Sequence, residues 1–120
     1  MRDIRFRGRD VNTDQWLYGY LSWYESPEKG LFINGKHVIP ESVGQFTEMK
    51  DVNGNDIYEK DILINPKDGT LFQVIYSNCF GGFGTIYLNN KIWGDLFIHL
   101  TDMHITRFGL KLLKNHEEKI

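Results

Sequence analysis

Short alternating runs of apolar and polar residues, separated by turn residues, occupy most of the chain. The first run, residues 2–9, places Ile4 and Phe6 on one side and three arginines on the other. A second run, residues 16–24, is rich in aromatic residues. Alternation with a period of two is typical of β-strands, whose successive side chains point to opposite faces. The pattern therefore predicts a protein of short strands joined by turns.

The first two runs predict an antiparallel hairpin with a defined register. A symmetric hairpin places an arginine opposite an aromatic residue three times: Arg9 and Trp16, Arg7 and Tyr18, Arg5 and Tyr20. The opposite face then gathers the aliphatic and remaining apolar residues, Ile4, Phe6, Leu17 and Leu21. A slip of one residue would mix the two sets, so we favour this register. We expect the apolar face to meet the core and the other face to hold cation–π contacts.

Later turns divide the rest of the chain into short segments. Asn34-Gly35 suits the tight turn of a hairpin between residues 31–33 and 36–39. Residues 51–55 and 65–70 are further turns, and residues 79–84 read as a glycine-rich mobile loop. The remaining predicted strands are residues 43–47, 62–64, 71–77, 85–88, 92–100 and 105–108. For residues 110–120 we expect a frayed tail with at most one helical turn.

These elements predict a mainly β fold in a single domain over residues 1–120. A small N-terminal antiparallel hairpin unit, residues 1–55, is expected to pack on an SH3-like unit, residues 56–109, followed by the tail, residues 110–120. Four or five short strands in the second unit suit a strongly bent sheet or a partial barrel.

Composition narrows the class of protein further. The chain has 120 residues, 41% of them hydrophobic, and a formal net charge of −2, which gives no overall attraction to polyanions. Its one cysteine, Cys79, excludes an internal disulfide framework. No apolar run approaches the roughly 20 residues of a membrane-spanning helix, and the first residues alternate where a signal peptide would be apolar. We expect a cytoplasmic protein.

Two stretches carry a family resemblance. Arg2-Asp3-Ile4-Arg5-Phe6-Arg7 with Asp10, and more specifically the stretch IPESVGQFTEMKDVNGNDIYEKDIL from Ile39 to Leu63, resemble the opening and the central signature of the YopX family of phage and prophage proteins. The sequence departs from the family pattern at Glu48 and Lys60, where glycine is usual. If those glycines adopt positive φ, each corner here carries strain or a changed shape.

The resemblance implies a mostly β, cytoplasmic protein of phage or prophage origin, present in a bacterial host, that self-associates. It implies no established activity. No motif in the chain indicates a cofactor, and we predict none.

Three carboxylates, Asp56, Glu59 and Asp61, lie within six residues, with Glu41 and Glu48 as possible neighbours. Grouped carboxylates serve general acid–base chemistry or bind a hard cation. The alternative, which we favour, is that they accept backbone N–H groups in the corner before Ile62. A calcium loop starting at Asp51 fails, because its sixth and twelfth positions would be Asp56 and Ile62 instead of glycine and glutamate.

His99, Asp102 and His104 are candidate metal ligands. On a regular strand His99 would point away from the other two, so a common site needs a bulge or turn at residues 100–101. Zinc would require one more ligand, for which His37 is available, or a water. The alternative is a pair of surface imidazoles at a strand end, and we predict no metal site.

Residues 81–84 are glycine-rich, as phosphate-binding loops are, but the sequence that follows predicts a strand where such loops require a helix. A flexible loop or a bulge is the better interpretation. Cys79 has no basic neighbour in the sequence, so we do not predict it to be a nucleophile.

The face predicted to carry Arg5, Arg7, Arg9, Trp16, Tyr18 and Tyr20 is the main candidate binding surface. We rank three interpretations of this face. A solvated or intramolecular set of contacts comes first, and a protein interface comes second. Binding of single-stranded nucleic acid comes third, because Asp3 and Asp10 reduce the positive charge of the face. We therefore predict a non-enzymatic accessory protein that acts by protein–protein contact, with itself and with an unknown host or phage protein. A nucleic-acid-binding regulator is the alternative, and a metal-dependent hydrolase the third possibility.

Overall fold

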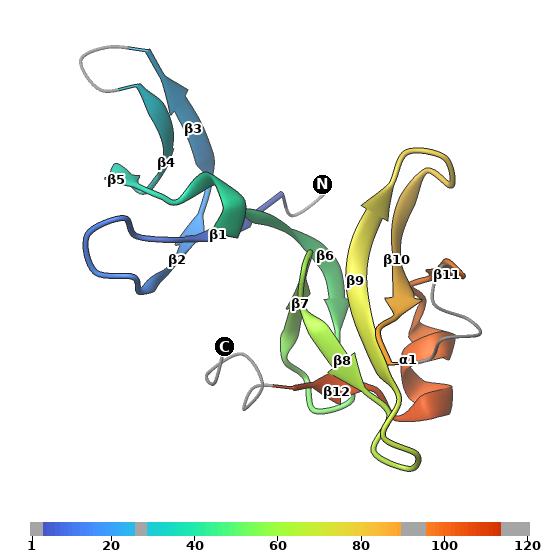
Figure 1. The fold of residues 1–120 in the computed structure, drawn as a ribbon. Helices are drawn as coiled ribbons and strands as arrows, with labels where there is room; N and C mark the ends of the chain where they lie inside the picture. Colours follow the sequence, from blue (N-terminus) through green and yellow to red (C-terminus); the bar gives the residue numbers. More distant parts are fainter. Residues whose placement is uncertain (1–3, 26–28, 90–95, 114–120) are drawn as a thin grey trace. The chain divides into compact units, whose positions relative to one another are not determined.

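The computed structural model of the protein describes residues 4–25, 29–89 and 96–113 (Figure 1). The chain forms two compact units, Met1–Phe46 (unit 1) and Thr47–Ile120 (unit 2). Both are built mainly from antiparallel strands, so the mainly β class predicted from the sequence is confirmed. Each unit is described separately below.

The described residues of unit 1 form five short strands, a turn of 3₁₀ helix and the start of a sixth strand. The elements are β1 (Phe6–Arg9), β2 (Trp16–Gly19), β3 (Leu21–Tyr24), β4 (Gly30–Ile33), β5 (Lys36–His37), η1 (Pro40–Ser42) and β6 (Gly44–Lys50). β1 pairs with β2 on one side and with the first residues of β6 on the other, whereas β3, β4 and β5 form a separate three-stranded sheet. Val38 and Ile33 are its most deeply buried apolar residues.

The predicted hairpin register is confirmed for the paired residues of β1 and β2. Arg9 lies opposite Trp16 and Arg7 opposite Tyr18. On the other face, a Cβ placed on Gly8 would lie 3.1 Å from Cβ of Val38, so β1 passes close to this buried residue. The prediction that Ile4 faces the core is wrong: its side chain is exposed, because it lies before the first paired residue of β1.

The single strand predicted over residues 16–24 is also wrong, because the chain changes partner at Tyr20. β2 ends at Gly19 and pairs with β1, while β3 begins at Leu21 and pairs with β4. The side chain of Asn34 meets the chain at this point: its Nδ2 donates to the carbonyl oxygen of Tyr18 at 2.9 Å. A Cβ on Gly19 would lie 2.5 Å from Oδ1 of Asn34, so glycine makes this close approach possible.

The tight turn at Asn34-Gly35 is confirmed. Ile33 pairs with Lys36, which leaves two residues in the loop, and both have positive φ, 53° at Asn34 and 78° at Gly35. Positive φ at both central positions defines the type I′ turn that matches the twist of the flanking strands.

In the described part of unit 2, the chain forms the rest of β6, six further strands and one helix. The further elements are β7 (Asp56–Tyr58), β8 (Ile62–Ile64), β9 (Leu71–Ser77), β10 (Gly82–Tyr87), β11 (Ile98–His99), α1 (Asp102–Phe108) and β12 (Lys111–Leu112). Five of the strands form one antiparallel sheet in the order β11-β10-β9-β8-β12, in which β9 and β10 form the longest pair (Figure 1). The sheet is not closed into a barrel.

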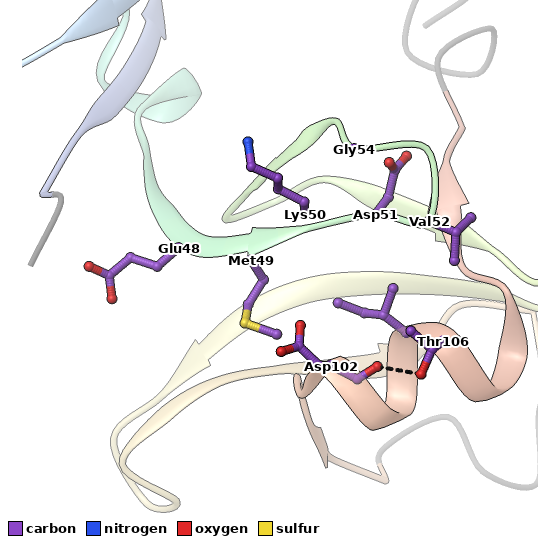
Figure 2. A pocket seen from close by; sticks show the side chains of 9 residues that line it. Glu48, Met49, Lys50, Asp51, Val52, Gly54, Asp102 and Thr106 are labelled. Atoms are coloured by element: carbon purple, nitrogen blue, oxygen red, sulfur yellow. Dashed lines mark hydrogen bonds between the residues drawn. The ribbon is translucent and has the colours of Figure 1, made fainter.

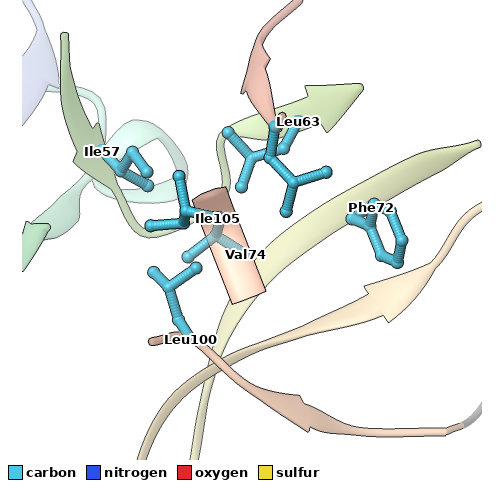
Figure 3. Close-up of a cluster of buried hydrophobic side chains, with 7 residues drawn as sticks. Ile57, Leu63, Phe72, Val74, Leu100 and Ile105 are labelled. Atoms are coloured by element: carbon cyan, nitrogen blue, oxygen red, sulfur yellow. The ribbon is translucent and has the colours of Figure 1, made fainter. Parts of the chain in front are cut away.

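The core of unit 2 lies between this sheet and α1. Figure 3 shows its side chains converging from strands, helix and connecting segments. The cluster consists of Ile57, Leu63, Phe72, Val74, Leu100, Ile105 and Leu110, all buried. Phe72 and Val74 are alternate residues of β9 and so point to the same face, as the period of two requires.

The strand predicted over residues 105–108 is wrong, because these residues belong to α1. Thr101 caps the helix: its hydroxyl accepts the N–H of His104 at 3.1 Å. Gly109 ends the helix in the left-handed region, with φ of 61°. A hydroxyl at the N-cap and a glycine after the last turn are typical helix boundaries. Of the strand predicted over residues 92–100, only Ile98–His99 is a strand in the described part, and residues 90–95 lie outside it.

Two other boundaries also differ from the prediction. The segment after α1 is not a frayed tail as far as it is described: Leu110 is fully buried, and β12 pairs with β8. Residues 114–120 of the predicted tail lie outside the described residues. The glycine-rich segment is shorter than the predicted loop, because β10 begins at Gly82 and already pairs there with Ser77.

Glu48 and Lys60, the two departures from the family pattern, both have positive φ, 69° and 79°. The hydroxyl of Thr47 accepts the N–H of Met49 at 3.1 Å and so spans the bend at Glu48. The N–H of Lys60 donates to the carbonyl oxygen of Val74 in β9 at 2.7 Å, which fixes the second corner. Both residues are thus held in a conformation that costs side-chain-bearing residues about 1–2 kcal/mol.

We predict that Glu48→Gly and Lys60→Gly each raise the free energy of unfolding. Glycine removes the cost of positive φ, and the greater freedom of the unfolded chain offsets part of it, so the expected gain is about 0.5–1 kcal/mol per site. Urea denaturation midpoints measure this. The matched control is Glu59→Gly. Glu59 precedes Lys60 in the same corner but does not have positive φ, so this variant should have a lower free energy of unfolding. A loss of stability in both test variants would contradict the prediction.

Candidate functional site

Five aromatic side chains between residues 16 and 24 are exposed on unit 1. We call them the aromatic surface: Trp16, Tyr18, Tyr20, Trp23 and Tyr24, with exposed fractions of 38%, 49%, 73%, 53% and 49%. The first two lie in β2 and the last two in β3. The sequence analysis singled out the first three but missed Trp23 and Tyr24, although five aromatic residues within nine positions was a visible signal. Large exposed aromatic side chains gathered in one short segment make this segment the candidate binding surface of unit 1.

The arginines of the predicted face are directed at groups of unit 1. The guanidinium of Arg7 lies 4.3 Å from the ring centre of Trp16, and Arg7 is buried. Arg9 lies 5.9 Å from the same ring and 3.4 Å from the carboxylate of Asp14. The cation–π contacts predicted for these two arginines are therefore confirmed.

Arg5 contacts a different ring from the one expected. Its guanidinium lies 4.4 Å from the ring centre of Phe46 in β6, and no pairing of Arg5 with Tyr20 forms, because β2 ends at Gly19. Gly44 lies opposite Arg7 in the β1–β6 pair and has no side chain, which leaves room for the buried arginine. Of the three arginines, Arg7 is thus buried within the unit, whereas the side chain of Arg9 remains 42% exposed.

The carboxylates Asp56, Glu59 and Asp61 do not share one site. Oδ1 of Asp56 contacts Nζ of Lys50 at 2.6 Å. Asp61 is buried, and its Oδ2 accepts the N–H of Tyr58 at 2.8 Å. Nothing in the structure brings Glu59 into this arrangement. Asp61 therefore holds the corner before β8, as a backbone partner.

The carboxylate of Asp51 accepts three backbone N–H groups. Its Oδ1 accepts the N–H groups of Asn53 and Asn55, both at 2.9 Å, and its Oδ2 accepts the N–H of Leu112 at 3.0 Å. Burial opposes ionisation of this carboxyl group, but the hydrogen bonds from Leu112, Asn55 and Asn53 outweigh it and hold the pKa of Asp51 below its ordinary value of 3.8.

The candidate metal ligands His99, Asp102 and His104 point to different surroundings. Nε2 of the exposed His99 lies 3.1 Å from the carbonyl oxygen of Phe80. His104 is buried, with Nε2 3.4 Å from Oγ1 of Thr85. Burial lowers the pKa of His104 below its ordinary value of 6.5, so its ring is neutral at pH 7.

No group of three or more His, Cys, Asp or Glu side chains suited to a metal ion occurs among residues 4–25, 29–89 and 96–113. His37, considered as a fourth ligand, lies in unit 1 and stacks on Phe32, with ring centres 4.8 Å apart.

A depression of about 500 Å³ lies in unit 2 beside α1. Figure 2 shows the sulfur-bearing side chain of Met49 and the carboxylate of Asp102 directed toward each other, and the hydroxyl of Thr106 donating to the carbonyl oxygen of Asp102 at 2.8 Å. The lining residues are Glu48, Met49, Lys50, Asp51, Val52, Gly54, Asp102, Ile105 and Thr106. Of the three lining carboxylates, that of Asp51 accepts backbone N–H groups and so serves the fold.

The glycine-rich segment leads from β9 into β10, as predicted for a strand connection. Cys79 is exposed within it. Phe80 and Phe97 stack with ring centres 4.9 Å apart beside this turn. The segment is therefore a hairpin end and does not precede a helix, which a phosphate-binding loop requires.

The fold and the site together define the class: a two-unit, mainly β protein in which polar residues of the signature shape turns and five aromatic residues between positions 16 and 24 are exposed. Among the described residues, no helix has both the length and the hydrophobicity of a membrane span. A family model described as YopX protein matches residues 5–108, and the chain belongs to this family. No protein with a curated description matches the chain.

We predict that Asp51→Ala lowers the free energy of unfolding by about 2–4 kcal/mol, because buried N–H groups lose their acceptor. Asp51→Asn is the matched variant: it keeps one acceptor oxygen but no negative charge, and should cost less. Since the pKa of Asp51 is lower in the folded state, its stabilisation is present above pH 3.8 and is lost as pH falls through the folded value.

Urea unfolding of both variants and the wild type at pH 7 and pH 3 measures these effects. The difference between wild type and Asp51→Asn should be smaller at pH 3 than at pH 7. An Asp51→Ala variant as stable as the wild type would contradict the role assigned to this carboxylate.

Proposed function

We propose that the protein is a phage or prophage accessory protein that acts by protein–protein contact through the aromatic surface of unit 1, and that it self-associates through this surface. Catalysis has no part in the proposal. The observation that carries it is the exposure of Trp16, Tyr18, Tyr20, Trp23 and Tyr24 on two consecutive strands.

The residue types of the aromatic surface favour protein contact. Tyrosine and tryptophan are enriched at the binding hot spots of protein interfaces, because each offers a large apolar area with few rotatable bonds and a polar group at its edge. Arg7 lies against Trp16 and is buried, which fixes the ring in place before any partner binds. A prearranged ring loses less side-chain entropy on association.

The charges of unit 1 argue for protein over nucleic acid. Residues 1–46 contain six Arg or Lys residues and six Asp or Glu residues. Arg9 faces the carboxylate of Asp14, Arg5 lies over Phe46, and Arg7 is buried. Binding to a nucleic-acid backbone depends on clustered cations that displace its counterions, and this arrangement presents few.

A non-catalytic role is supported by how the candidate reactive groups are used. Asp61 and Asp51 accept backbone N–H groups, and His104 is buried beside Thr85. A general acid or base must be able to reach a substrate proton, and these groups are engaged within the fold.

We predict that the wild-type chain of 14.1 kDa associates at micromolar concentration, and that Tyr18→Ala and Trp23→Ala each raise the dissociation constant at least about tenfold. Sedimentation equilibrium or light scattering measures this. Tyr76→Ala in unit 2 is the matched control, because Tyr76 is exposed to 48% and Tyr18 to 49%. This control should associate as the wild type does.

A wild-type chain that remains a monomer, or association that neither variant weakens, would contradict self-association through this surface. Binding of single-stranded DNA or RNA that falls steeply with salt and is lost in Tyr18→Ala would instead support the nucleic-acid alternative.

A further inference from the structure

The strand β3 has an open edge. In the adjoining pair, the N–H of Val38 donates to the carbonyl oxygen of Leu31, so the backbone groups of Leu31 point from β4 toward β5. Successive residues of a strand point their backbone groups to opposite neighbours. Leu31 pairs with Trp23 and Ile33 with Leu21, so the N–H and C=O groups of Leu21 and Trp23 point away from β4, to the outside. No described residue forms a hydrogen bond with them.

Three other edge strands, β2, β5 and β12, each have an outward backbone group that is bound by another residue. At β2, the carbonyl oxygen of Tyr18 accepts Nδ2 of Asn34. At the end of β5, the carbonyl oxygen of His37 accepts the N–H of Val11 at 3.0 Å. At β12, the N–H of Leu112 meets the carboxylate of Asp51. Natural sheets protect their edges in such ways, and an open edge invites pairing with another strand.

We propose that β3 pairs antiparallel with β3 of a second copy of this chain, around a two-fold axis at Ser22. This inference rests on the proposed function and specifies the partner and the geometry of the same surface. With the axis at Ser22, Leu21 lies opposite Trp23 of the second copy and Trp23 opposite Leu21, so the outward-pointing groups of both residues exchange hydrogen bonds. Ser22 then faces Ser22 of the copy, and the two three-stranded sheets become one of six.

The side chains suit this register. Opposite residues on one face of an antiparallel pair interact directly. On one face, Trp23 would meet Leu21 of the second copy, and on the other, Tyr24 would meet Tyr20. These are residues of the exposed aromatic surface and the half-buried Leu21. An axis at Ser22 also brings no like charges together, because residues 20–24 contain no charged side chain.

The test uses the charge of residue 22 in the full-length chain. Ser22 is exposed, so Ser22→Lys and Ser22→Glu should both fold, which circular dichroism checks. Each variant alone places two like charges on the axis and should raise the dissociation constant at least about tenfold at low salt. Mixed in equal amounts, the two variants should associate again with wild-type affinity, as a heterodimer of opposite charges.

The matched control is the pair Asn12→Lys and Asn12→Glu, at an exposed position in the loop between β1 and β2. Neither should alter association. A second readout is covalent: Ser22→Cys combined with Cys79→Ser should form a disulfide-linked dimer on oxidation, because facing residues of this type have Cα atoms about 4.5 Å apart, within the range a disulfide spans. Asn12→Cys in the same background should not.

The outcomes separate this inference from the proposed function. Wild-type association that Tyr18→Ala weakens, but that Ser22→Lys leaves unchanged, would overturn the β3 pairing and leave the aromatic surface as the contact. Loss of association in both Ser22 variants without recovery on mixing would place residue 22 in the interface but away from the axis, which also overturns the proposed register. A monomeric wild type would overturn both.

Discussion

The carboxylate of Asp51 is the group on which the arrangement of unit 2 depends. It closes the turn between β6 and β7 through the N–H groups of Asn53 and Asn55, and it also binds the N–H of Leu112, 61 residues further along the chain. Next to it, the N–H of Val52 donates to the carbonyl oxygen of Leu110 at 3.1 Å. One buried side chain thus joins the first turn of the unit to its last strand. A buried N–H group without an acceptor is costly. The two carboxylate oxygens of Asp51 serve as the acceptors for all three of these N–H groups.

Other residues of the family signature also form hydrogen bonds with the backbone at bends of the chain. The hydroxyl of Thr47 donates to the carbonyl oxygen of Ile57 at 2.8 Å and spans the bend at Glu48, while Asp61 holds the corner at Lys60. Ile57 itself is fully buried in the core. The acids and the hydroxyl described here are thus backbone partners that hold the turns of unit 2.

Features set by local rules could be predicted from the sequence. The register of β1 and β2 follows from alternation, and the turn at Asn34-Gly35 from the tolerance of these residues for positive φ. For Glu48 and Lys60 the resemblance gave only a condition, that the family's glycines there adopt positive φ, and both residues do have positive φ.

Features set by distant contacts could not. β12 depends on Asp51, and the burial of Arg7 depends on the missing side chain of Gly44 in another strand. The helix α1 was missed for a different reason. Its seven residues are too few to show helical periodicity, and Met103 and Ile105 alternate with polar residues as in a strand. For the site, the sequence identified the first part of the aromatic surface but could not separate arginines held inside the unit from arginines open to a ligand.

The size of unit 1 links its stability to the contact proposed for it. A unit of 46 residues, Met1–Phe46, is below the roughly 70–80 residues at which a single core supplies enough burial energy by itself. Yet it leaves Tyr20 73% exposed and Trp23 53% exposed, so apolar area that could contribute to folding is withheld from its core. Burying that area in an assembly would stabilise the assembly by about 25 cal/mol for each Å² of apolar surface removed from water. Anything that binds only the folded chain stabilises it by mass action, so the stability of unit 1 should depend on protein concentration wherever the aromatic surface is the contact.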